Sequence, residues 1–265
     1  MAMTAPISAS PFHPYCGAPP SPGALWHRWN LDPVLLVALA VIGGGYLLLA
    51  RKSALPIWRQ AAFSAGWCLT ALALVSPICP LSVALFSARV GQHMFLVCVT
   101  APLVALGWPD RQTSASAARW RPILAASAFA AALWIWHSPG PYDETFRSTP
   151  IYWLMHLTTF GAALLLWRSM LSAWRRSLEG VAVATLITVS QMAVLGAVIT
   201  LAAQPLYAPH LLAAWRWGLS PLEDQQLGGV IMWVPAGVLL SIALAGGFAE
   251  ALSRSEARAE ARPAA

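Results

Sequence analysis

The chain has 265 residues, of which 58% are hydrophobic and only 10% are charged, and its formal net charge is +6. Soluble domains carry about a quarter charged residues, so this composition predicts an integral membrane protein surrounded by lipid. The basic residues lie at the ends of apolar stretches and form no single patch, so no nucleic-acid partner is expected.

Residues 1–30 precede the first apolar stretch and are rich in Pro, Ser, Ala and Gly. They lack the basic start and the apolar core of a cleavable signal peptide. Their composition predicts a disordered tail on the outer, periplasmic side of the membrane.

Seven apolar stretches follow, each close to the roughly 20 residues that a spanning helix needs. The third is the shortest, and Leu81–Phe86 either extends it or forms a short interfacial piece. The predicted fold is an all-α integral membrane protein, a seven-transmembrane-helix bundle over residues 31–250 with a C-terminal tail over 251–265. The stretches are Pro33–Ala50, Ile57–Ser76, Gly91–Gly107, Trp120–Trp136, Pro150–Leu171, Val181–Ala203 and Gln226–Ala249.

Lys and Arg predict the orientation of this bundle. If the N-terminus lies outside and the C-terminus in the cytoplasm, the inner loops and the C-terminal tail hold twelve of the sixteen Lys and Arg residues. The outer side then holds only Arg28, Arg89, Arg147 and Arg216. This asymmetry follows the positive-inside rule.

The same orientation places all six histidines in the outer half of the protein. His93, His137 and His156 belong to the third, fourth and fifth stretches, and Met232 of the seventh lies at a similar depth. Polar residues inside a membrane usually face the bundle interior and have a function. Imidazole and thioether donors suit copper, with softness favouring Cu(I). We therefore predict a metal site formed by these four residues, with Met94 as a further donor.

Each of these residues also has an ordinary explanation when it is taken singly. A histidine near the membrane boundary can hydrogen-bond a lipid headgroup or a backbone carbonyl, and a buried methionine usually only packs. The metal hypothesis therefore depends on the histidines converging in space.

The segment "WHSPGPYD" ends the fourth stretch. Pro139, Gly140 and Pro141 predict a stiff turn that stops the helix. Tyr142 and Asp143 are then held near His137. Asp143 either orients an imidazole or caps the segment that follows.

The segment "LEDQQLGG" opens the seventh stretch with Asp224 and Gln225. Asp224, Gly228 and Met232 have helical spacing and share one face. Gly228 and Gly229 allow that helix to approach a neighbour closely. Because metal-binding imidazoles usually donate their second N–H to a carboxylate, carbonyl or water, we expect Asp143 or Asp224 to accept a hydrogen bond from a clustered histidine.

The four cysteines form no CxxC pair, so no thiolate metal clamp is evident. Cys16 and Cys79 both face the oxidising side, and the sequence leaves open whether they pair. Fingerprints of serine hydrolases, zinc proteases, P-loop proteins and dinucleotide-binding proteins are missing. The chain is therefore not expected to be an enzyme.

Four features together resemble the CtaG family of multi-span cytochrome c oxidase assembly factors, also called the caa(3)-type oxidase assembly family. They are "QHM" followed by "APLVALG", "WHSPGPYD", a histidine early in the fifth stretch, and "DQQLGGVIMWVP", and the likeness covers about residues 30–250. The matching positions are His93, His137, Asp143, His156, Asp224, Gln225, Gly229 and Met232.

The resemblance implies a bacterial inner-membrane protein with seven spans that is needed to mature a haem–copper oxidase, and it associates the protein with copper. The oxidase subunits would be its partners. Family members often read HMxxH before the third span, whereas this chain has Arg89 and Val90 at the first two positions and keeps only His93. A guanidinium cannot ligate a metal, so one donor is lost.

The predicted function is a non-enzymatic assembly factor that accepts copper, as Cu(I), on the periplasmic face and passes it to a nascent oxidase subunit. His93, His156 and Met232 are the expected ligands, with His137 as an exchange ligand. Two alternatives remain open. One is a haem protein in which two imidazoles bind one iron, and the other is a metal-free scaffold whose polar cluster only rigidifies the bundle. A transporter is disfavoured because the polar residues stop in one leaflet.

Overall fold

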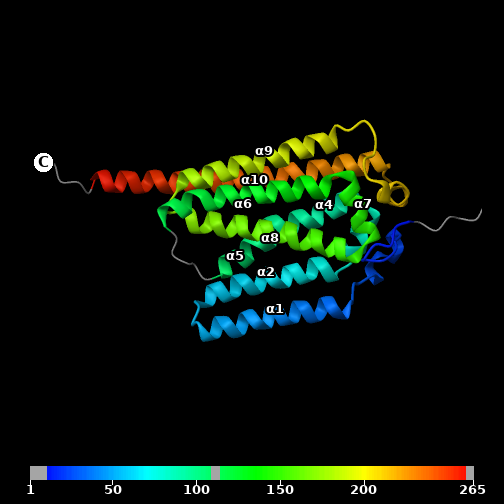
Figure 1. Cartoon of the computed structure of the whole chain (residues 1–265), viewed down its shortest axis with the longest axis horizontal. Coiled ribbons are helices and arrows are strands. Elements are labelled where there is room, and N and C mark those ends of the chain that lie inside the picture. The colour runs from blue at the N-terminus through cyan, green and yellow to red at the C-terminus, as the bar shows by residue number, and fades with distance from the viewer. Residues whose placement is uncertain (1–10, 109–113, 261–265) are drawn as a thin grey trace, which may run out of the picture.

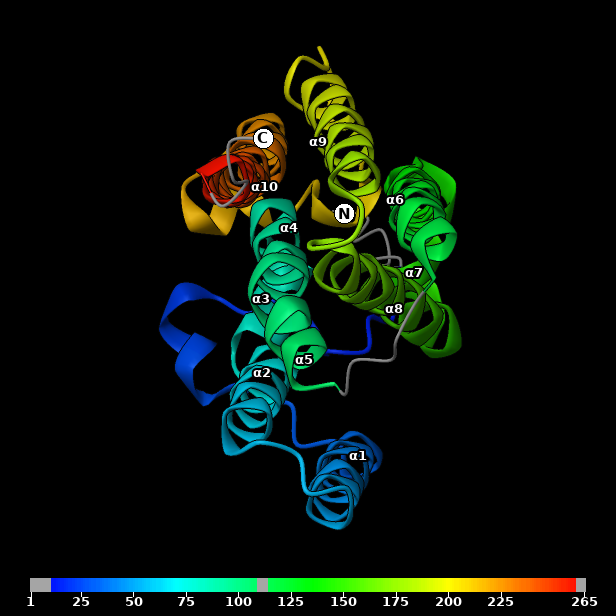
Figure 2. The same ribbon diagram turned by 90° about the vertical axis from the view of Figure 1, so that its left-hand side faces the viewer.

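A computed structural model describes residues 11–108 and 114–260 of the chain. Helix accounts for 81% of the structure, and the described residues contain no strand. The long helices lie along one common axis in Figure 1 and are seen end-on in Figure 2. The predicted all-α class is therefore confirmed.

The first two helices form one edge of the bundle. α1 spans Pro33–Lys52 and α2 spans Ile57–Val75. α1 begins where the carboxylate of Asp32 accepts a 2.8 Å hydrogen bond from the backbone N–H of Val34, as helix N-caps do. Both views show α1 at the periphery, next to α2 (Figures 1 and 2).

The third predicted stretch begins earlier than its apolar run suggests. α3 spans Ile78–Ala84 and follows α2 after a 49° bend. α4 (Phe86–Phe95), a π-helical segment (Leu96–Thr100) and α5 (Ala101–Gly107) then form one long helical unit. The piece Leu81–Phe86 thus belongs mostly to the separate helix α3. The long unit lies in the interior, where α4 packs on α10, and α5 packs on α2 and α8.

The stiff turn predicted after the fourth stretch is wrong, because this segment is a helix. α6 spans Ala115–His137, and α7 spans Pro139–Arg147 at an angle of 72° to it. Ser138 between them is extended. A proline in the first turn of a helix needs no N–H partner, and its fixed φ suits the helix. Pro139 and Pro141 therefore start a new helix across the end of the bundle (Figure 1).

Three long helices complete the fold. α8 spans Thr149–Ala173, α9 spans Leu178–Thr200 and α10 spans Pro221–Glu260. α6 packs on both α8 and α9, and α9 packs along α10. With 40 residues, α10 is about 60 Å long and extends past its neighbours in Figure 1. The seventh predicted stretch, residues 226–249, lies within it.

Among the described residues, four helical units are long and apolar enough to cross a membrane: α1, Phe86–Gly107, α8 and α9. The two bent pairs, α2 with α3 and α6 with α7, would raise the number to six. Large apolar side chains cover the outside of these helices, for example Val34 (76% exposed) and Leu157 (69%). So much exposed apolar surface fits lipid and not water. The protein is therefore a membrane protein.

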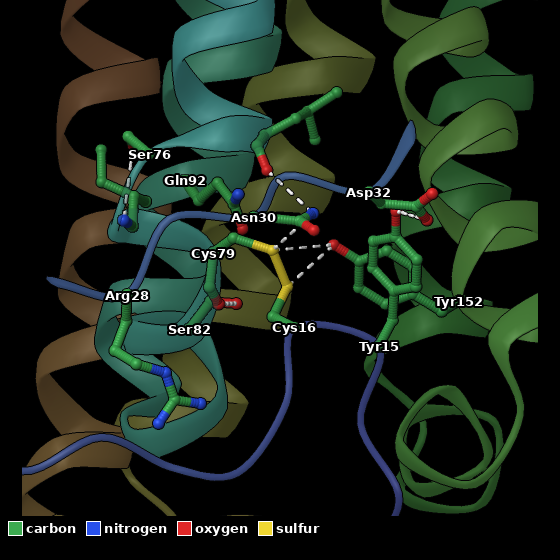
Figure 3. The surroundings of a disulfide bond; sticks show 12 residues. Tyr15, Cys16, Arg28, Asn30, Asp32, Ser76, Cys79, Ser82, Gln92 and Tyr152 are labelled. Atoms are coloured by element: carbon green, nitrogen blue, oxygen red, sulfur yellow. Dashed lines mark hydrogen bonds between the residues drawn. A yellow bond between two sulfur atoms is a disulfide. The ribbon is translucent and has the colours of Figure 1, made fainter. Parts of the chain in front are cut away.

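Residues 11–30, which we call the N-terminal strap, fold over one end of the bundle. Cys16 forms a disulfide with Cys79 of α3 (Figure 3). The ring of Tyr15 stacks on that of Tyr152 in α8 with centroids 4.9 Å apart. The predicted disorder therefore does not hold for these residues, because a covalent bond and aromatic contacts supply an order that a Pro- and Gly-rich composition does not indicate.

Candidate metal-binding site

Two of the predicted histidines meet inside the bundle. His93 lies on α4 and His156 on α8, and their ring centroids are 5.1 Å apart. The Nε2 atom of each ring is buried and has no hydrogen-bond partner within the described part of the chain. A buried polar atom without a partner is costly, so the pair is a place where a ligand would be stabilised.

Backbone carbonyls determine which ring nitrogen is free in His156 and in His137. The Nδ1 atom of His156 lies 3.1 Å from the carbonyl oxygen of Tyr152. Because a carbonyl only accepts, Nδ1 carries the proton and Nε2 presents its lone pair. His137 has the same arrangement, with Nδ1 2.8 Å from the carbonyl oxygen of Leu133. Metal-binding histidines commonly hold their second nitrogen in this way.

A small cavity of about 20 Å³ lies beside His93. This volume is about what one water molecule needs, so a single ion also fits. Two histidines and three methionines are among the residues that line it, and the other lining side chains are mostly apolar. The donor residues are His93, His137, Met94, Met155 and Met232.

His156 does not line this cavity but approaches His93 from another side. It lines an apolar hollow of about 320 Å³ that α1, α2 and α8 enclose with the π-helical segment. Among the described residues, no three His, Cys, Asp or Glu side chains converge closely enough to hold a metal ion. An ion between the two imidazoles would therefore need thioether donors as well. Met155 supplies one that was not among the predicted ligands.

The predicted hydrogen bond between an aspartate and a histidine is not present in the described structure. The carboxylate of Asp224 accepts instead from the backbone N–H groups of Phe86 (2.7 Å) and Ser87 (3.0 Å) and from the Ser87 hydroxyl (2.5 Å). It thereby caps α4, whose first N–H groups have no partner within the helix. Asp143 is half-buried, and its Oδ1 atom has no partner in the described region. Backbone carbonyls instead orient the imidazoles of His137 and His156.

The other residues of "LEDQQLGG" join α10 to its neighbours. The Gln225 side chain accepts from the N–H of Leu206 (2.6 Å) and donates to the carbonyl of Ile199 (3.1 Å). A Cβ at Gly229 would clash with the backbone of α9. A Cβ at Gly228 would clash with the ring of Phe86, the first residue of α4. The face that carries Asp224 and Gly228 therefore lies against α4, and places Met232 at the cavity.

Arg89 lies deep in the site, although the sequence places it only on the outer side. Its side chain is 2% exposed. The guanidinium lies over the rings of Phe146 (4.4 Å) and Tyr142 (5.0 Å), and Nη2 donates a 2.7 Å hydrogen bond to the Thr145 hydroxyl. The sequence signal for this arrangement is weak, since a lone arginine before an apolar stretch usually faces water.

His210, in the loop between α9 and α10, completes this cluster. Its Nε2 atom shares a 2.7 Å hydrogen bond with the hydroxyl of Tyr142. Burial lowers the pKa of His210 to about 3, and the positive charge of Arg89 adds to the effect. His210 is therefore neutral at physiological pH. The sequence placed this histidine on the outer side but did not assign it to the site.

The N-terminal strap reaches the histidine pair through Tyr152. The hydroxyl of Tyr152 lies 3.5 Å from Sγ of Cys16 and 3.9 Å from Sγ of Cys79 (Figure 3). The ring of Tyr152 lies 4.3 Å from that of His156, measured between centroids. The disulfide thus holds the strap close to the histidine pair.

A second contact fixes the strap to the start of α1. The hydroxyl of Tyr15 donates a 2.5 Å hydrogen bond to the Asp32 carboxylate (Figure 3). Burial raises the pKa of Tyr15 above its usual range, and the neighbouring carboxylate raises it further. The same hydrogen bond lowers the pKa of Asp32. The pair therefore keeps a neutral phenol and a charged carboxylate over a wide pH range.

These features define a polytopic α-helical membrane protein with imidazoles and thioethers buried near one end. The family model described as cytochrome c oxidase caa3 assembly factor matches residues 43–254, and the chain belongs to this family. The resemblance seen in the sequence is thus confirmed. No curated protein and no solved structure matches the chain significantly. The family match begins within α1, so the N-terminal strap lies outside it.

Proposed function

We propose that this protein is a non-enzymatic assembly factor of a bacterial haem–copper oxidase, and that it takes Cu(I) as its cargo and transfers it to an oxidase subunit. Membership of the family supports the role in assembly. The observation that carries the copper part is the pair of buried, unpartnered Nε2 atoms of His93 and His156. The soft sulfur donors next to them favour Cu(I) over harder ions.

In this proposal each side chain has a distinct task. His93 and His156 bind the ion through Nε2, and the carbonyl that holds Nδ1 of His156 keeps its ring in the binding tautomer. Met155 and Met232 add thioether donors, and Met94 lines the same cavity. His137 serves as an exchange ligand at the cavity wall. Because copper binds such donors strongly, release requires that a partner protein offers competing ligands.

We further propose seven spans in the cell inner membrane, with the N-terminus in the periplasm and the C-terminus in the cytoplasm. The twelve basic residues assigned to the inner side support this orientation. The disulfide between Cys16 and Cys79 supports it independently, because disulfides persist in the periplasm and are rare in the cytosol. It lies at the same end of the bundle as His156. The proposed site is therefore periplasmic.

One observation favours a second candidate, a haem protein. The 320 Å³ hollow beside His156 is apolar and within the size range of small-molecule sites. The cavity beside His93 is far too small for a macrocycle. A haem would therefore occupy the hollow with His156 as one ligand, and the purified protein would show a Soret absorption band.

The binding test uses the detergent-purified chain, loaded with Cu(I) under reducing, oxygen-free conditions and then dialysed. Elemental analysis should find about one copper per wild-type chain. We expect His93→Ala and His156→Ala to lose the copper, while His27→Ala, which changes an exposed histidine of the strap, retains it. A wild-type protein that holds no copper would overturn the copper proposal.

The cellular test measures oxidase polypeptide and oxidase activity in a deletion strain. Cells without the protein should make the oxidase polypeptides but little active enzyme, and added copper should partly restore activity. If the wild-type protein holds no copper and His156→Ala still abolishes maturation, the scaffold alternative replaces copper delivery.

A further inference from the structure

Arg89 is a buried charge without a counter-ion in the described structure. Its guanidinium is held by the Thr145 hydroxyl, by the faces of aromatic rings and by the Met155 sulfur, which lies 3.5 Å from Nη2. None of these groups is an anion. The ion pairs found in the described residues, Arg119–Glu179 and Arg147–Glu144, lie elsewhere. The full positive charge of Arg89 therefore acts on whatever binds nearby.

This charge stands next to the proposed copper site. Arg89 and His93 are four residues apart on α4, so their Cβ atoms are about 6 Å apart on one face of the helix. Met155 connects the two groups, since its sulfur contacts Arg89 and its side chain lines the cavity beside His93. A cation bound by His93 would lie within a low-dielectric region close to a guanidinium.

We propose that Arg89 determines the charge selectivity of the site and favours monovalent Cu(I) over divalent ions such as Zn²⁺. This inference rests on the proposed function and names its cargo more narrowly. Repulsion between two charges is proportional to each of them. With an effective dielectric constant of about 20 and a separation of roughly 8 Å, it weakens binding by about 30-fold for each unit of charge on the ion. The free-energy cost of this repulsion is therefore twice as large for a divalent ion as for Cu(I).

The site needs selectivity against divalent ions because its imidazole ligands do not supply it. Imidazole is a good ligand for Zn²⁺ and other divalent metals as well as for copper, so two free imidazoles alone would also capture divalent ions. The fixed charge of Arg89 opposes this capture. It also lowers the affinity for Cu(I) moderately, which favours transfer of the ion to a partner.

The test measures the dissociation constants of Cu(I) and Zn²⁺ on the full-length protein in detergent, by competition with coloured chelators. Arg89→Gln should bind Zn²⁺ more tightly by at least about tenfold relative to its own change in Cu(I) affinity. Arg89→Lys keeps the charge but loses the planar contacts, and it should retain the wild-type ratio of the two affinities. Arg216→Gln removes an exposed charge of the loop between α9 and α10 and should leave both constants unchanged.

The ratio of two affinities on one preparation does not depend on the fraction of folded protein, so partial misfolding of a variant does not disguise the result. An equal change of both constants in Arg89→Gln would overturn charge selection but leave copper binding intact. A wild-type protein that binds neither ion would overturn the proposed function and this inference together.

Discussion

His93 and His156 face each other from α4 and α8 with ring centroids 5.1 Å apart, and the Nε2 atom of each is buried without a hydrogen-bond partner in the described structure. Two free imidazole nitrogens in a membrane interior are unfavourable unless they bind something. The surrounding thioethers, the cap of α4 and the strap can each be tested separately.

The thioether of Met155 should strengthen Cu(I) binding. We expect Met155→Leu to weaken the affinity for Cu(I) by roughly tenfold, about 1.4 kcal/mol, because a soft donor is lost while the packing volume is nearly conserved. Competition with a Cu(I) chelator measures the change. Met192→Leu is the matched control, since Met192 is 2% exposed but does not line the cavity. Equal affinities of the two variants would show that Met155 only packs.

The carboxylate of Asp224 should be a major contributor to stability. Asp224→Ala leaves two backbone N–H groups at the start of α4 and the Ser87 hydroxyl without an acceptor. We expect the free energy of unfolding to fall by about 2–4 kcal/mol. Chemical unfolding of the detergent-solubilised protein measures this. Glu223→Gln, at the exposed neighbouring position, keeps an oxygen that accepts from the Ser220 N–H and should change it by less than about 0.5 kcal/mol. Similar effects of both substitutions would contradict the capping role.

The disulfide should stabilise the strap. Cys16 and Cys79 are separated by 63 residues, and a native disulfide that closes such a loop typically contributes about 2–4 kcal/mol. We expect the double variant Cys16→Ser/Cys79→Ser to melt at a lower temperature than the wild type and to be cleaved faster by trypsin at Arg28. Treatment with a dithiol reductant should reproduce both effects. Cys68→Ser, which removes an exposed free thiol, should cause neither. Resistance of the reduced strap to trypsin would contradict this role.

Acid should destabilise the fold through His210. The pKa of His210 is about 3 in the folded protein against an ordinary value of 6.5, so the unfolded chain binds the extra proton more readily. The contribution of neutral His210 to the free energy of unfolding is fully present above pH 6.5. It is lost as the pH falls towards 3, by up to about 1.4 kcal/mol per pH unit. Melting temperatures at pH 7 and pH 5 should therefore differ more in the wild type than in His210→Gln. Equal differences would show that another group controls the acid response.

Local chemistry was enough to predict most of the long helices. Runs of apolar residues identify spans wherever they occur, because the cost of placing backbone and charge in lipid does not depend on which helix is the neighbour. Pro33–Ala50 and Val181–Ala203 accordingly end within three residues of the ends of α1 and α9. The family motifs could also be recognised in the sequence, because each is short and contiguous.

The helix at Pro139 and the order of the strap were not predictable in the same way. A proline can either end a helix or begin one, and what decides is whether the following residues find partners. The ring of Tyr142 in α7 packs against Arg89, and its hydroxyl shares a hydrogen bond with His210. Tyr15 of the strap stacks on Tyr152. None of these partners is near in sequence.

The sequence alone determined that this is a bundle of apolar helices with imidazoles and thioethers near one end. Only the tertiary structure decided which of them meet. His93 pairs with His156 and shares a cavity with His137, while Asp224, expected at a histidine, caps α4 from 138 residues away. The physical reason is that hydrophobicity sets the depth of a residue in the membrane, whereas the rotation and packing of each helix decide which way its side chains point.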